Sequence, residues 1–250
     1  MRLSIIIPSY NQFQFIEATL QNVAELKELA IENGVEIEVI LFDNQSNQAV
    51  QDILKKYTHL FDVLKIEPDK GQYDAINKGI AHVTGDYWTW LNTDDLIDKN
   101  GIVEIINYLK TSQPDYIYGD IETIDEKGQT LSINTSGDFS LYTLTHQDAS
   151  ISQPGSFFKT TFTKKIGLLS AYKFAFDYEY ILRILKNNGK VVKLNCVVAQ
   201  FRYYTQSKSG SRNPQFLIEQ QQIAKMYGGN RFSKLNILLT LRIIKRKLLS

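Results

Sequence analysis

The chain has 250 residues, of which 43% are hydrophobic, and this is enough to bury the core of one large domain. The net charge of +1 gives no sign of a nucleic-acid partner, and the single cysteine, Cys196, excludes an internal disulfide and a cysteine-based zinc site; its apolar surroundings predict a buried thiol in a reducing compartment. No apolar run reaches the roughly 18 residues of a membrane-spanning helix, and we see no secretory signal, so we expect a soluble or peripheral cytoplasmic protein.

The first part of the chain alternates short apolar runs with amphipathic stretches. The apolar runs predict strands at residues 3–8, 35–42, 63–66 and 87–91. The amphipathic stretches predict helices at residues 13–29, 49–57, 73–82 and 102–110. This alternation is typical of βαβ units, so the sequence predicts an α/β fold with a mostly parallel sheet flanked by helices.

The pattern changes after residue 110. Short strands are predicted at residues 116–120, 122–124 and 130–133, with a turn at residues 125–128, and we interpret them as a small antiparallel hairpin added to the sheet. Residues 134–150 show no clear period and favour a loop over a site. The remaining expected elements are a helix at residues 177–186, a strand at residues 191–201 and a helix at residues 213–227.

Polar residues follow each of the four predicted strands of the first part. They are residues 9–11, 43–46, 69–73 and 92–95. Sheets of this kind bind ligands beyond the carboxyl ends of their strands, so we expect these residues to line one crevice. Trp88 and Trp90 lie on one face of their strand, and we expect both indoles to pack in the core rather than bind a ligand.

Asn92-Thr93-Asp94-Asp95 is the most informative of these segments. Two adjacent carboxylates at a strand end repel each other, and a divalent cation is the natural compensator. A second interpretation stays open on this tetrapeptide alone, because Asp95 precedes a helical pattern and Asp is a good N-cap residue.

Taken in order, the motifs of the chain resemble those of family 2 glycosyltransferases with the GT-A fold, and the resemblance spans residues 3 to about 210. The motifs are Pro8-Ser9-Tyr10-Asn11, Asp43-Asn44-Gln45-Ser46, Asp69-Lys70-Gly71-Gln72-Tyr73-Asp74, Gly85-Asp86, Leu91-Asn92-Thr93-Asp94-Asp95, Gln153-Pro154-Gly155-Ser156 and Phe176-Asp177-Tyr178-Glu179-Tyr180. Each motif is weak, but their conjunction in the order of the family is strong, and it favours the metal-site interpretation of Asp94 and Asp95.

The resemblance implies a metal and a base for an inverting sugar transfer. Asp94, with Asp95 beside it, matches the position that binds Mn²⁺ or Mg²⁺. Asn92 stands where many relatives carry an acid, so we expect diphosphate and water to supply several metal ligands. Asp177 matches the acid that deprotonates the acceptor hydroxyl, although it could also serve only as a helix N-cap; Glu179 is an alternative base about 200° around the helix.

The resemblance also implies binding residues for both substrates. The expected donor-binding residues are Pro8, Tyr10, Asn11, Asp43, Lys70, Asp74, Asn92 and Thr93. The expected acceptor-binding residues are Gln153, Gly155 and Glu179. Two of these residues have an alternative interpretation without a ligand: Asp43 could cap the following helix, and Lys70 could be hydrated by solvent only. Arg202 and Lys208 fall in a segment similar to one that folds over the diphosphate in such enzymes, and a solvated basic loop is the alternative.

The last twenty residues differ in charge from the rest of the chain. Residues 231–250 hold six basic residues and no acid, while the rest of the chain holds 22 basic and 27 acidic residues. Leucine and isoleucine alternate with these cations, and two interpretations stay open: a helix lying on an anionic membrane, or a final helix packed on the domain. We divide the chain into a glycosyltransferase domain at residues 1–212, with a nucleotide-binding half at 1–110 and an acceptor-binding half at 111–212, and a helical tail at 213–250.

The sequence thus predicts a metal-dependent inverting glycosyltransferase at the inner face of the plasma membrane, with a nucleotide-sugar donor. A uridine diphosphate donor is favoured by its frequency in the family, and a glycan or lipid-linked acceptor of surface polysaccharide assembly is expected. Two alternatives are a nucleotide-sugar binding module without catalysis, which Asn92 would permit, and a sugar-phosphate nucleotidyltransferase.

Overall fold

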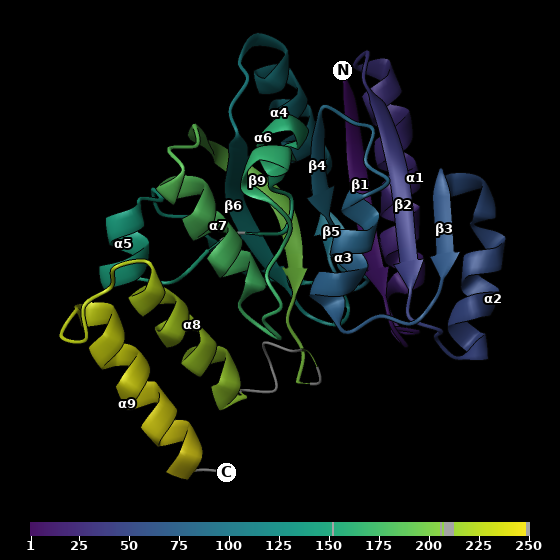
Figure 1. The fold of residues 1–250 in the computed structure, drawn as a ribbon. Helices are drawn as coiled ribbons and strands as arrows, with labels where there is room; N and C mark the ends of the chain where they lie inside the picture. The colour runs from purple at the N-terminus through teal and green to yellow at the C-terminus, as the bar shows by residue number, and fades with distance from the viewer. Residues whose placement is uncertain (152, 206, 208–212, 249–250) are drawn as a thin grey trace.

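The computed structural model describes residues 1–151, 153–205, 207 and 213–248. It confirms the predicted alternation of strands and helices in the first part of the chain (Figure 1). The strands are β1 (Arg2–Ser9), β2 (Glu36–Asp43), β3 (Val63–Ile66) and β4 (Tyr87–Trp90). The helices are α1 (Ile16–Glu32), α2 (Gln48–Lys56), α3 (Gln72–Ile80) and α4 (Lys99–Thr111), with a 3-10 turn, η1 (Thr58–Leu60), after α2.

The second part of the chain contains the remaining described elements. They are β6 (Tyr116–Ile124), β7 (Thr130–Asn134), α5 (Leu141–His146), β8 (Phe157–Lys159), α6 (Thr160–Ile166), α7 (Phe176–Lys186), β9 (Val191–Arg202), α8 (Pro214–Met226) and α9 (Lys234–Leu248). The expected hairpin is present as β6 and β7, but β6 is one continuous strand in the middle of the sheet rather than two short ones.

The segment at residues 134–150 is more ordered than a loop. It contains α5, which begins with a capping box between Ser140 and Thr143. Leu144 of this helix and the nearby Ala149 are buried in the core, so the segment packs as well as connects. The interpretation as a loop over a site is therefore wrong for α5.

The residues that follow Asp95 also differ from expectation. Leu96–Ile97 form a short strand, β5, which pairs with β9. Helix α4 begins later, and Asp98 is its N-cap, with Oδ1 accepting from the backbone N–H of Gly101 at 2.8 Å. Because Asp98 caps the helix, the capping interpretation of Asp95 is wrong.

One sheet of nine described strands runs through the molecule in the order β3-β2-β1-β4-β8-β6-β9-β5, and β7 pairs with residues 121–124 of β6 off this path. Strands β1 to β4 are parallel. β8 is antiparallel to both β4 and β6, and β9 is parallel to β6, so β6 and β9 run in the same direction as β1. The carboxyl ends of these six strands therefore lie at one edge of the sheet, which we call the carboxyl edge; it is the lower edge in Figure 1.

Helices cover both faces of this sheet, as the continuous apolar runs of the strands require. Leu3, Ile5 and Ile7 of β1 face a core formed with α1, α2 and α4, whereas Ile6 faces a second core formed with α3, α5, α7 and α8. The expected α/β fold with a mostly parallel sheet is confirmed.

The second core is rich in stacked aromatic rings. Trp88 and Trp90 are 0% and 1% exposed, and both stack on Phe158. The indole N–H of Trp88 donates to Thr163 Oγ1 at 2.8 Å, so its polar atom is satisfied inside the protein. Both tryptophans thus pack in the core, as predicted.

Cys196 in β9 is half-buried rather than fully buried, and burial raises the pKa of its thiol.

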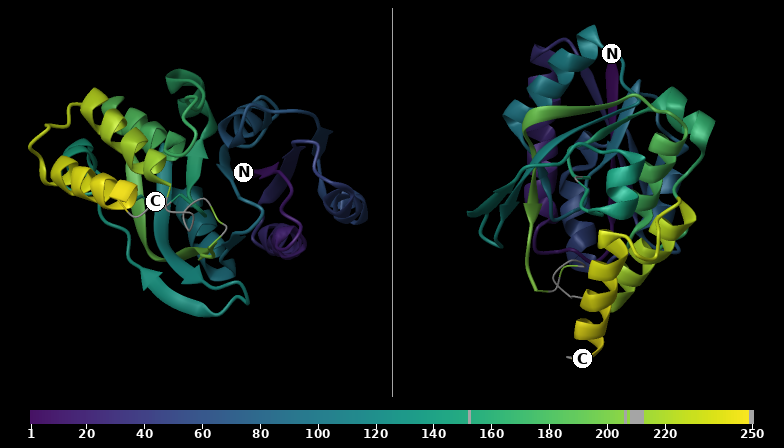
Figure 2. Two further views of the ribbon diagram at one scale, coloured as in Figure 1. Left: turned by 90° about the horizontal axis from the view of Figure 1, so that it is seen from below. Right: turned by 90° about the vertical axis from the view of Figure 1, so that its left-hand side faces the viewer.

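Helices α8 and α9 pack against each other in opposite directions, beside α5 and α7 (Figures 1 and 2). Helix α9 projects past the carboxyl edge. α9 buries Leu235, Asn236 and Leu239 toward the second core. Among the described residues, no helix is long and apolar enough to cross a membrane.

Candidate active site

The four polar segments that follow β1 to β4 meet at the carboxyl edge through hydrogen bonds between neighbouring segments. Ser9 Oγ donates to Asp43 Oδ2 at 2.7 Å, which joins the ends of β1 and β2. Asn44 Oδ1 accepts from the backbone N–H of Asp69 at 3.0 Å, which joins the segments after β2 and β3. These bonds place the predicted cradle in one continuous rim.

Asp43 organises this rim rather than offering a free carboxylate. Its side chain is 1% exposed, and Oδ1 accepts from Ser46 N–H and Gln51 Nε2 at 2.8 and 2.7 Å. Oδ2 accepts from the hydroxyls of Ser9 and Ser46. These four donors match the four acceptor positions of a carboxylate, so Asp43 holds the rim together, and its contact with a nucleotide-sugar donor stays a prediction.

The segment after β1 presents its side chains outward. Tyr10 is 63% exposed, and Asn11 adopts a left-handed conformation with φ of 51°. Asn11 Oδ1 accepts from Asn47 N–H at 2.8 Å, which fixes this turn against the start of α2. Pro8 is half-buried within β1. Of these residues, Tyr10 offers the largest surface to a nucleotide base.

The segment between β3 and α3 forms a tight turn. Gly71 has φ of 124°, which favours glycine, and Lys70 N–H donates to Asp74 Oδ2 at 3.0 Å. The Lys70 side chain is exposed. Burial raises the pKa of the Asp69 carboxyl, whose Oδ1 accepts from Gly71 N–H. Asp74 thus stabilises the turn that carries Lys70.

Asn92 and Asp95 hold the segment after β4 together. Asn92 Oδ1 accepts from Gln72 Nε2, and Asn92 Nδ2 donates to Asp95 Oδ2 at 2.9 Å. The other oxygen of Asp95 accepts from the backbone N–H of Arg202 at 3.0 Å. Thr93 between them is buried.

The environments of the two adjacent carboxylates are different. Asp95 is 1% exposed, and burial, followed by the charge of Asp94, raises its pKa well above the ordinary value. Asp94 is only partly buried, and its Oδ2 accepts from the Tyr204 hydroxyl at 2.8 Å. Both oxygens of Asp95 have N–H partners, and Asp94 is the more exposed of the two carboxylates.

Arg202 is a structural residue rather than a mobile closer. It is 5% exposed, and its guanidinium donates to the backbone carbonyls of Asp94, Asp125 and Glu126. It also lies over the ring of Phe15 at 4.6 Å from the centroid. Lys208, the other expected closer, lies outside the residues that the structure describes.

Asp177 lies at the same edge as Asp94. Helix α7 is joined to β9 by a short connection and runs opposite to it, so the N-terminus of α7 lies at the carboxyl edge. Phe176 packs its ring 5.9 Å from that of Trp90, two residues before Asn92. Asp177 is partly buried in the first turn of α7, and its Oδ1 accepts from Tyr178 N–H at 2.7 Å. Sheet direction and ring packing together bring Asp94 and Asp177 to one edge.

Glu179 is turned away from this edge. It is 2% exposed, forms an ion pair with Arg183 and accepts from the Tyr227 hydroxyl. The structure therefore gives Glu179 a role in packing α7 against the end of α8, not the acceptor contact that we expected.

Gln153 and Gly155 also hold the fold. Gln153 Nε2 donates to the carbonyl of Trp90 at 3.0 Å, and its own carbonyl accepts from Ser156. Gly155 has φ of 71°, and a Cβ there would lie 2.6 Å from the carbonyl oxygen of Val198. Both residues are buried, and their contact with an acceptor stays a prediction.

Sequence reasoning missed one buried carboxylate that binds the turn before Asp177. Glu219 of α8 is 6% exposed and accepts from three consecutive backbone N–H groups, those of Lys173, Phe174 and Ala175. These residues form the turn that leads into α7. No local pattern marks Glu219, because its partners lie 44 to 46 residues away in the sequence.

The donor set at the carboxyl edge fits a hard divalent cation held mainly by its ligand. No group of three or more His, Cys, Asp or Glu side chains that could hold a metal is found in the described part of the chain. The carboxylate of Asp94 is partly buried. Next to it in the chain is the buried Asp95, whose pKa is raised by burial and by the charge of Asp94. Mg²⁺ and Mn²⁺ accept one or two carboxylates together with phosphate oxygens and water, so the residues present fit such an ion.

Solved structures with the same fold are glycosyltransferases of the GT-A class. The chain is similar to Staphylococcus aureus TarS residues 1–349 in complex with UDP-GlcNAc, with a TM-score of 0.71 and 15% identity over 98% of this chain and 73% of the other. It is also similar to the mannosyltransferase PcManGT of Pyrobaculum calidifontis in complex with GDP-Man and Mn²⁺, with a TM-score of 0.65 and 16% identity over 97% and 69% of the two chains. At these identities the likeness shows the fold.

The sequence profile of glycosyl transferase family 2 matches residues 4–176, and the chain belongs to this family. It is 30% identical over 132 residues to an uncharacterized glycosyltransferase of Rickettsia felis. This alignment covers 52% of this chain and only 21% of that relative. It is 25% identical over 208 residues to a PGL/p-HBAD biosynthesis glycosyltransferase of Mycobacterium bovis, over 80% of this chain and 77% of the relative. The resemblance found in the motifs is thus confirmed.

Proposed function

We propose that this protein transfers a sugar from a nucleoside diphosphate donor to a hydroxyl group with inversion at the anomeric carbon. The observation that carries the proposal is the placement of Asp94 and the first turn of α7 at one edge of the sheet. An inverting displacement needs a base on one side of the anomeric carbon and a stabilised leaving group on the other. A carboxylate that follows β4, Asp94, and a carboxylate in the first turn of α7, Asp177, are proposed for these two positions.

In the proposed reaction Asp177 accepts the proton of the acceptor hydroxyl. The acceptor oxygen forms a bond to the anomeric carbon while the bond from that carbon to the diphosphate breaks, and the nucleoside diphosphate leaves with both electrons. Asp177 lies in the first turn of α7, and Glu219 holds the preceding turn through three N–H groups, so the carboxylate is fixed in position.

Asp94 is the proposed ligand of a divalent ion, Mn²⁺ or Mg²⁺. When bound, such an ion neutralises the charge that develops on the departing diphosphate. Asp95 and Asn92 hold the segment that carries Asp94, and Tyr10, Asn11, Thr93 and the exposed Lys70 are proposed to contact the donor. Asp43 and Asp74 are proposed to act through the loops that they fix.

A uridine diphosphate donor and an acceptor in surface polysaccharide or glycolipid assembly complete the proposal. TarS and PcManGT have nucleotide sugars bound, and the mycobacterial relative is named for the biosynthesis of PGL/p-HBAD. These names support a nucleotide-sugar donor for this chain.

Thermal melting with a panel of nucleotide sugars and Mn²⁺ tests the proposal. A donor present at 100 times its dissociation constant adds about 2.7 kcal/mol to the free energy of unfolding, so the true donor raises the melting temperature. Turnover with that donor should release a nucleoside diphosphate. Release of pyrophosphate would indicate a nucleotidyltransferase instead, and binding without turnover on any hydroxyl acceptor would indicate a binding module.

We further propose that α9 lies on an anionic membrane surface. Its outer face exposes Ile237 (49%), Leu241 (59%), Ile244 (51%) and Leu248 (80%), which follow one another at helical spacing. Four cations, Arg242, Lys245, Arg246 and Lys247, lie in the C-terminal half of the helix, and one of them, Arg246, donates to the carbonyl of Asn213. Since α9 also buries Leu235 and Leu239, it packs on the domain and exposes an apolar stripe, which combines the two interpretations of the sequence.

Binding of the full chain to vesicles tests this contact. Sedimentation with vesicles of phosphatidylglycerol and phosphatidylcholine is expected for the parent and is expected to weaken for Leu241→Ser with Ile244→Ser. Ile133→Ser is the matched control, because Ile133 is 61% exposed on β7, away from α9. Equal sedimentation of the α9 variant and the parent, or sedimentation of neither, would contradict a membrane role for α9.

A further inference from the structure

The hydroxyl of Tyr204 joins the segment after β1 to the proposed metal ligand. It donates to Asp94 Oδ2 at 2.8 Å and accepts from Gln12 Nε2. Gln12 follows β1, Asp94 follows β4 and Tyr204 follows β9, so this chain of two hydrogen bonds ties three strand ends together at the carboxyl edge.

The direction of these two bonds is fixed by chemistry. The amide nitrogen of Gln12 can only donate, so the phenol oxygen must accept from it. A phenol has one hydrogen, and this hydrogen is then left for the carboxylate of Asp94. Asp94 can only accept, so the phenol hydrogen goes to Asp94 while the phenol oxygen accepts from Gln12.

The ring of Tyr204 is held in place independently of this chain. Tyr204 is 8% exposed and packs edge-on against Phe15, with ring centroids 5.1 Å apart. Phe15 is itself covered by the Arg202 guanidinium, and the Tyr204 carbonyl accepts from Ser207 Oγ at 2.7 Å. A ring fixed in this way presents its hydroxyl at a constant position, which is what a partly exposed carboxylate needs if it is to be preorganised.

We propose that Tyr204 is a positioning residue for Asp94, and that Gln12 supports it by donating to the same hydroxyl. The Tyr204 hydroxyl holds one oxygen of the carboxylate, so that Asp94 meets the ion and the diphosphate without first losing side-chain freedom. Hydrogen-bonded partners of metal-binding carboxylates serve this purpose in metal sites generally. The inference rests on the proposed function, because it assumes that Asp94 is the metal ligand.

The test measures Mn²⁺ binding in the presence of uridine diphosphate. The electron paramagnetic resonance signal of free Mn²⁺ reports how much of the ion is unbound. Tyr204→Phe keeps the ring and its packing on Phe15 and is expected to weaken Mn²⁺ binding by roughly 10- to 100-fold. Tyr203→Phe is the matched control, because Tyr203 is adjacent, 42% exposed and bonded to Ile124 through its backbone N–H, and it should bind Mn²⁺ like the parent.

Gln12→Glu provides a second, independent variant. The new carboxylate would compete with Asp94 for the single phenol hydrogen, so Mn²⁺ binding should weaken although Tyr204 is intact. A purely structural role for Tyr204 would lower the melting temperature of Tyr204→Phe and leave Mn²⁺ affinity unchanged.

The outcomes separate this inference from the proposed function. Mn²⁺ binding by Tyr204→Phe at parental strength or tighter, with a parent that binds Mn²⁺, overturns the role of Tyr204 alone. A parent that binds no Mn²⁺ with the nucleotide overturns both.

Discussion

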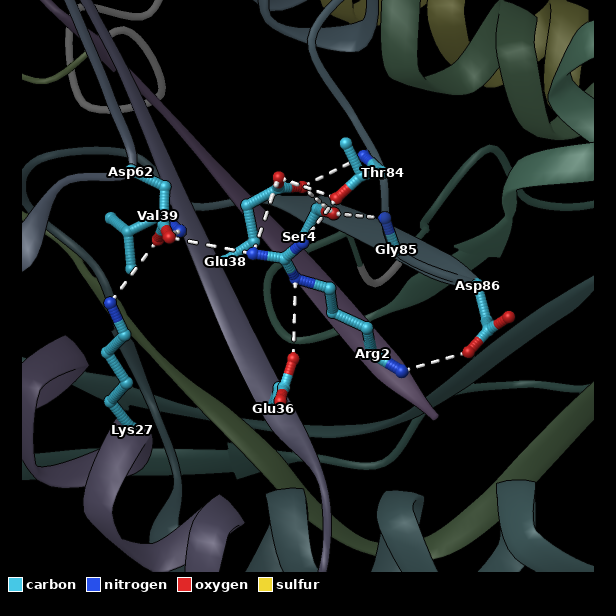
Figure 3. A network of polar contacts seen from close by, with 10 residues as sticks. All are labelled: Arg2, Ser4, Lys27, Glu36, Glu38, Val39, Asp62, Thr84, Gly85 and Asp86. Carbon is cyan, nitrogen blue, oxygen red and sulfur yellow. Dashed lines mark hydrogen bonds and ion pairs between the residues drawn. The ribbon is translucent and has the colours of Figure 1, made fainter.

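The two edges of the sheet contain buried carboxylates of the same kind but differ in what lies beside them. At the amino edge Glu38 is 4% exposed and accepts from the Ser4 hydroxyl and from the N–H and hydroxyl of Thr84, with Arg2 3.8 Å away (Figure 3). At the carboxyl edge Asp43 and Asp95 are equally buried and hydrogen-bonded.

The difference lies in the neighbours of the partly exposed carboxylates. At the amino edge Asp62 forms ion pairs with Arg2 and Lys27. At the carboxyl edge Asp94 accepts from the Tyr204 hydroxyl and is adjacent to the buried Asp95. Asp94 and Asp177 are each partly buried and lie directly after a strand or at the start of a helix. A buried carboxylate with all its hydrogen bonds made stabilises a fold, whereas one that solvent and substrate can reach can do chemistry. The comparison predicts that substitution of the partly exposed carboxylates at the carboxyl edge lowers turnover. Substitution of the buried carboxylate at the amino edge should lower the free energy of unfolding and leave turnover unchanged.

Asp177→Asn should have the largest effect on turnover. Removal of a general base is expected to lower kcat by about 10²- to 10⁴-fold, while binding of the donor with Mn²⁺ stays near the parental value, because the amide keeps the shape of the side chain. Steady-state kinetics and donor titration measure the two quantities. Asp138→Asn, in an exposed segment, is the control. A loss of kcat smaller than roughly tenfold would remove Asp177 as the base.

Asp94→Ala should have the next largest effect. Loss of the metal ligand is expected to lower kcat on the order of 10²- to 10³-fold and to abolish Mn²⁺ binding. Asp95→Ala is the matched neighbour: it leaves the N–H of Arg202 and the amide of Asn92 without their partner, so it should lower the free energy of unfolding by about 1–3 kcal/mol and retain Mn²⁺ binding. The reverse assignment of the two aspartates is correct if Asp95→Ala loses Mn²⁺ and Asp94→Ala does not.

Glu219→Gln should have a smaller, mixed effect. The variant keeps the shape of the side chain but loses the charge that three N–H groups share, so the free energy of unfolding should fall by about 1–3 kcal/mol. The turn before Asp177 should loosen, which lowers kcat and leaves the donor KM unchanged. Glu28→Gln on the exposed side of α1 controls for charge. An unchanged kcat would show that Glu219 does not position Asp177.

Glu38→Gln should have the smallest effect on turnover. The side-chain amide nitrogen of the new glutamine would face the N–H and O–H groups of Ser4 and Thr84, which now donate to Glu38. Because two donors cannot bond to each other, the free energy of unfolding should fall by about 1–3 kcal/mol. Chemical denaturation measures this loss, and kcat/KM should stay at the parental value. A parallel fall of kcat/KM would mean that the two edges are coupled, which would break the comparison.

The sequence was most informative about the order of elements and the position of the site. The apolar runs of β1, β2 and β4 are buried on both faces, which makes them visible as continuous hydrophobic segments, whereas β3 at the end of the sheet is partly exposed. The polar residues that follow them converge because the strands are parallel, and this needs no knowledge of individual contacts.

The roles of single carboxylates could not be predicted in the same way. Asp43 and Asp95 each accept from a partner that is distant in the sequence, Ser9 at 34 residues and Arg202 at 107 residues, and no local pattern encodes such pairs. The ion pair of Glu179 with Arg183 is different, because the two residues are four apart on one helix face. That spacing is a sequence signal for a structural Glu179. Ser140 and Thr143, which begin α5, are a second local signal of this kind.

A crystal structure with uridine diphosphate and Mn²⁺, with the anomalous signal of manganese recorded, tests the central claim most directly. We predict one manganese peak that bridges Asp94 and the diphosphate, with the Asp177 carboxylate facing the same cleft. A manganese peak away from Asp94, or an Asp177 side chain on the far side of the molecule from the diphosphate, would contradict the account.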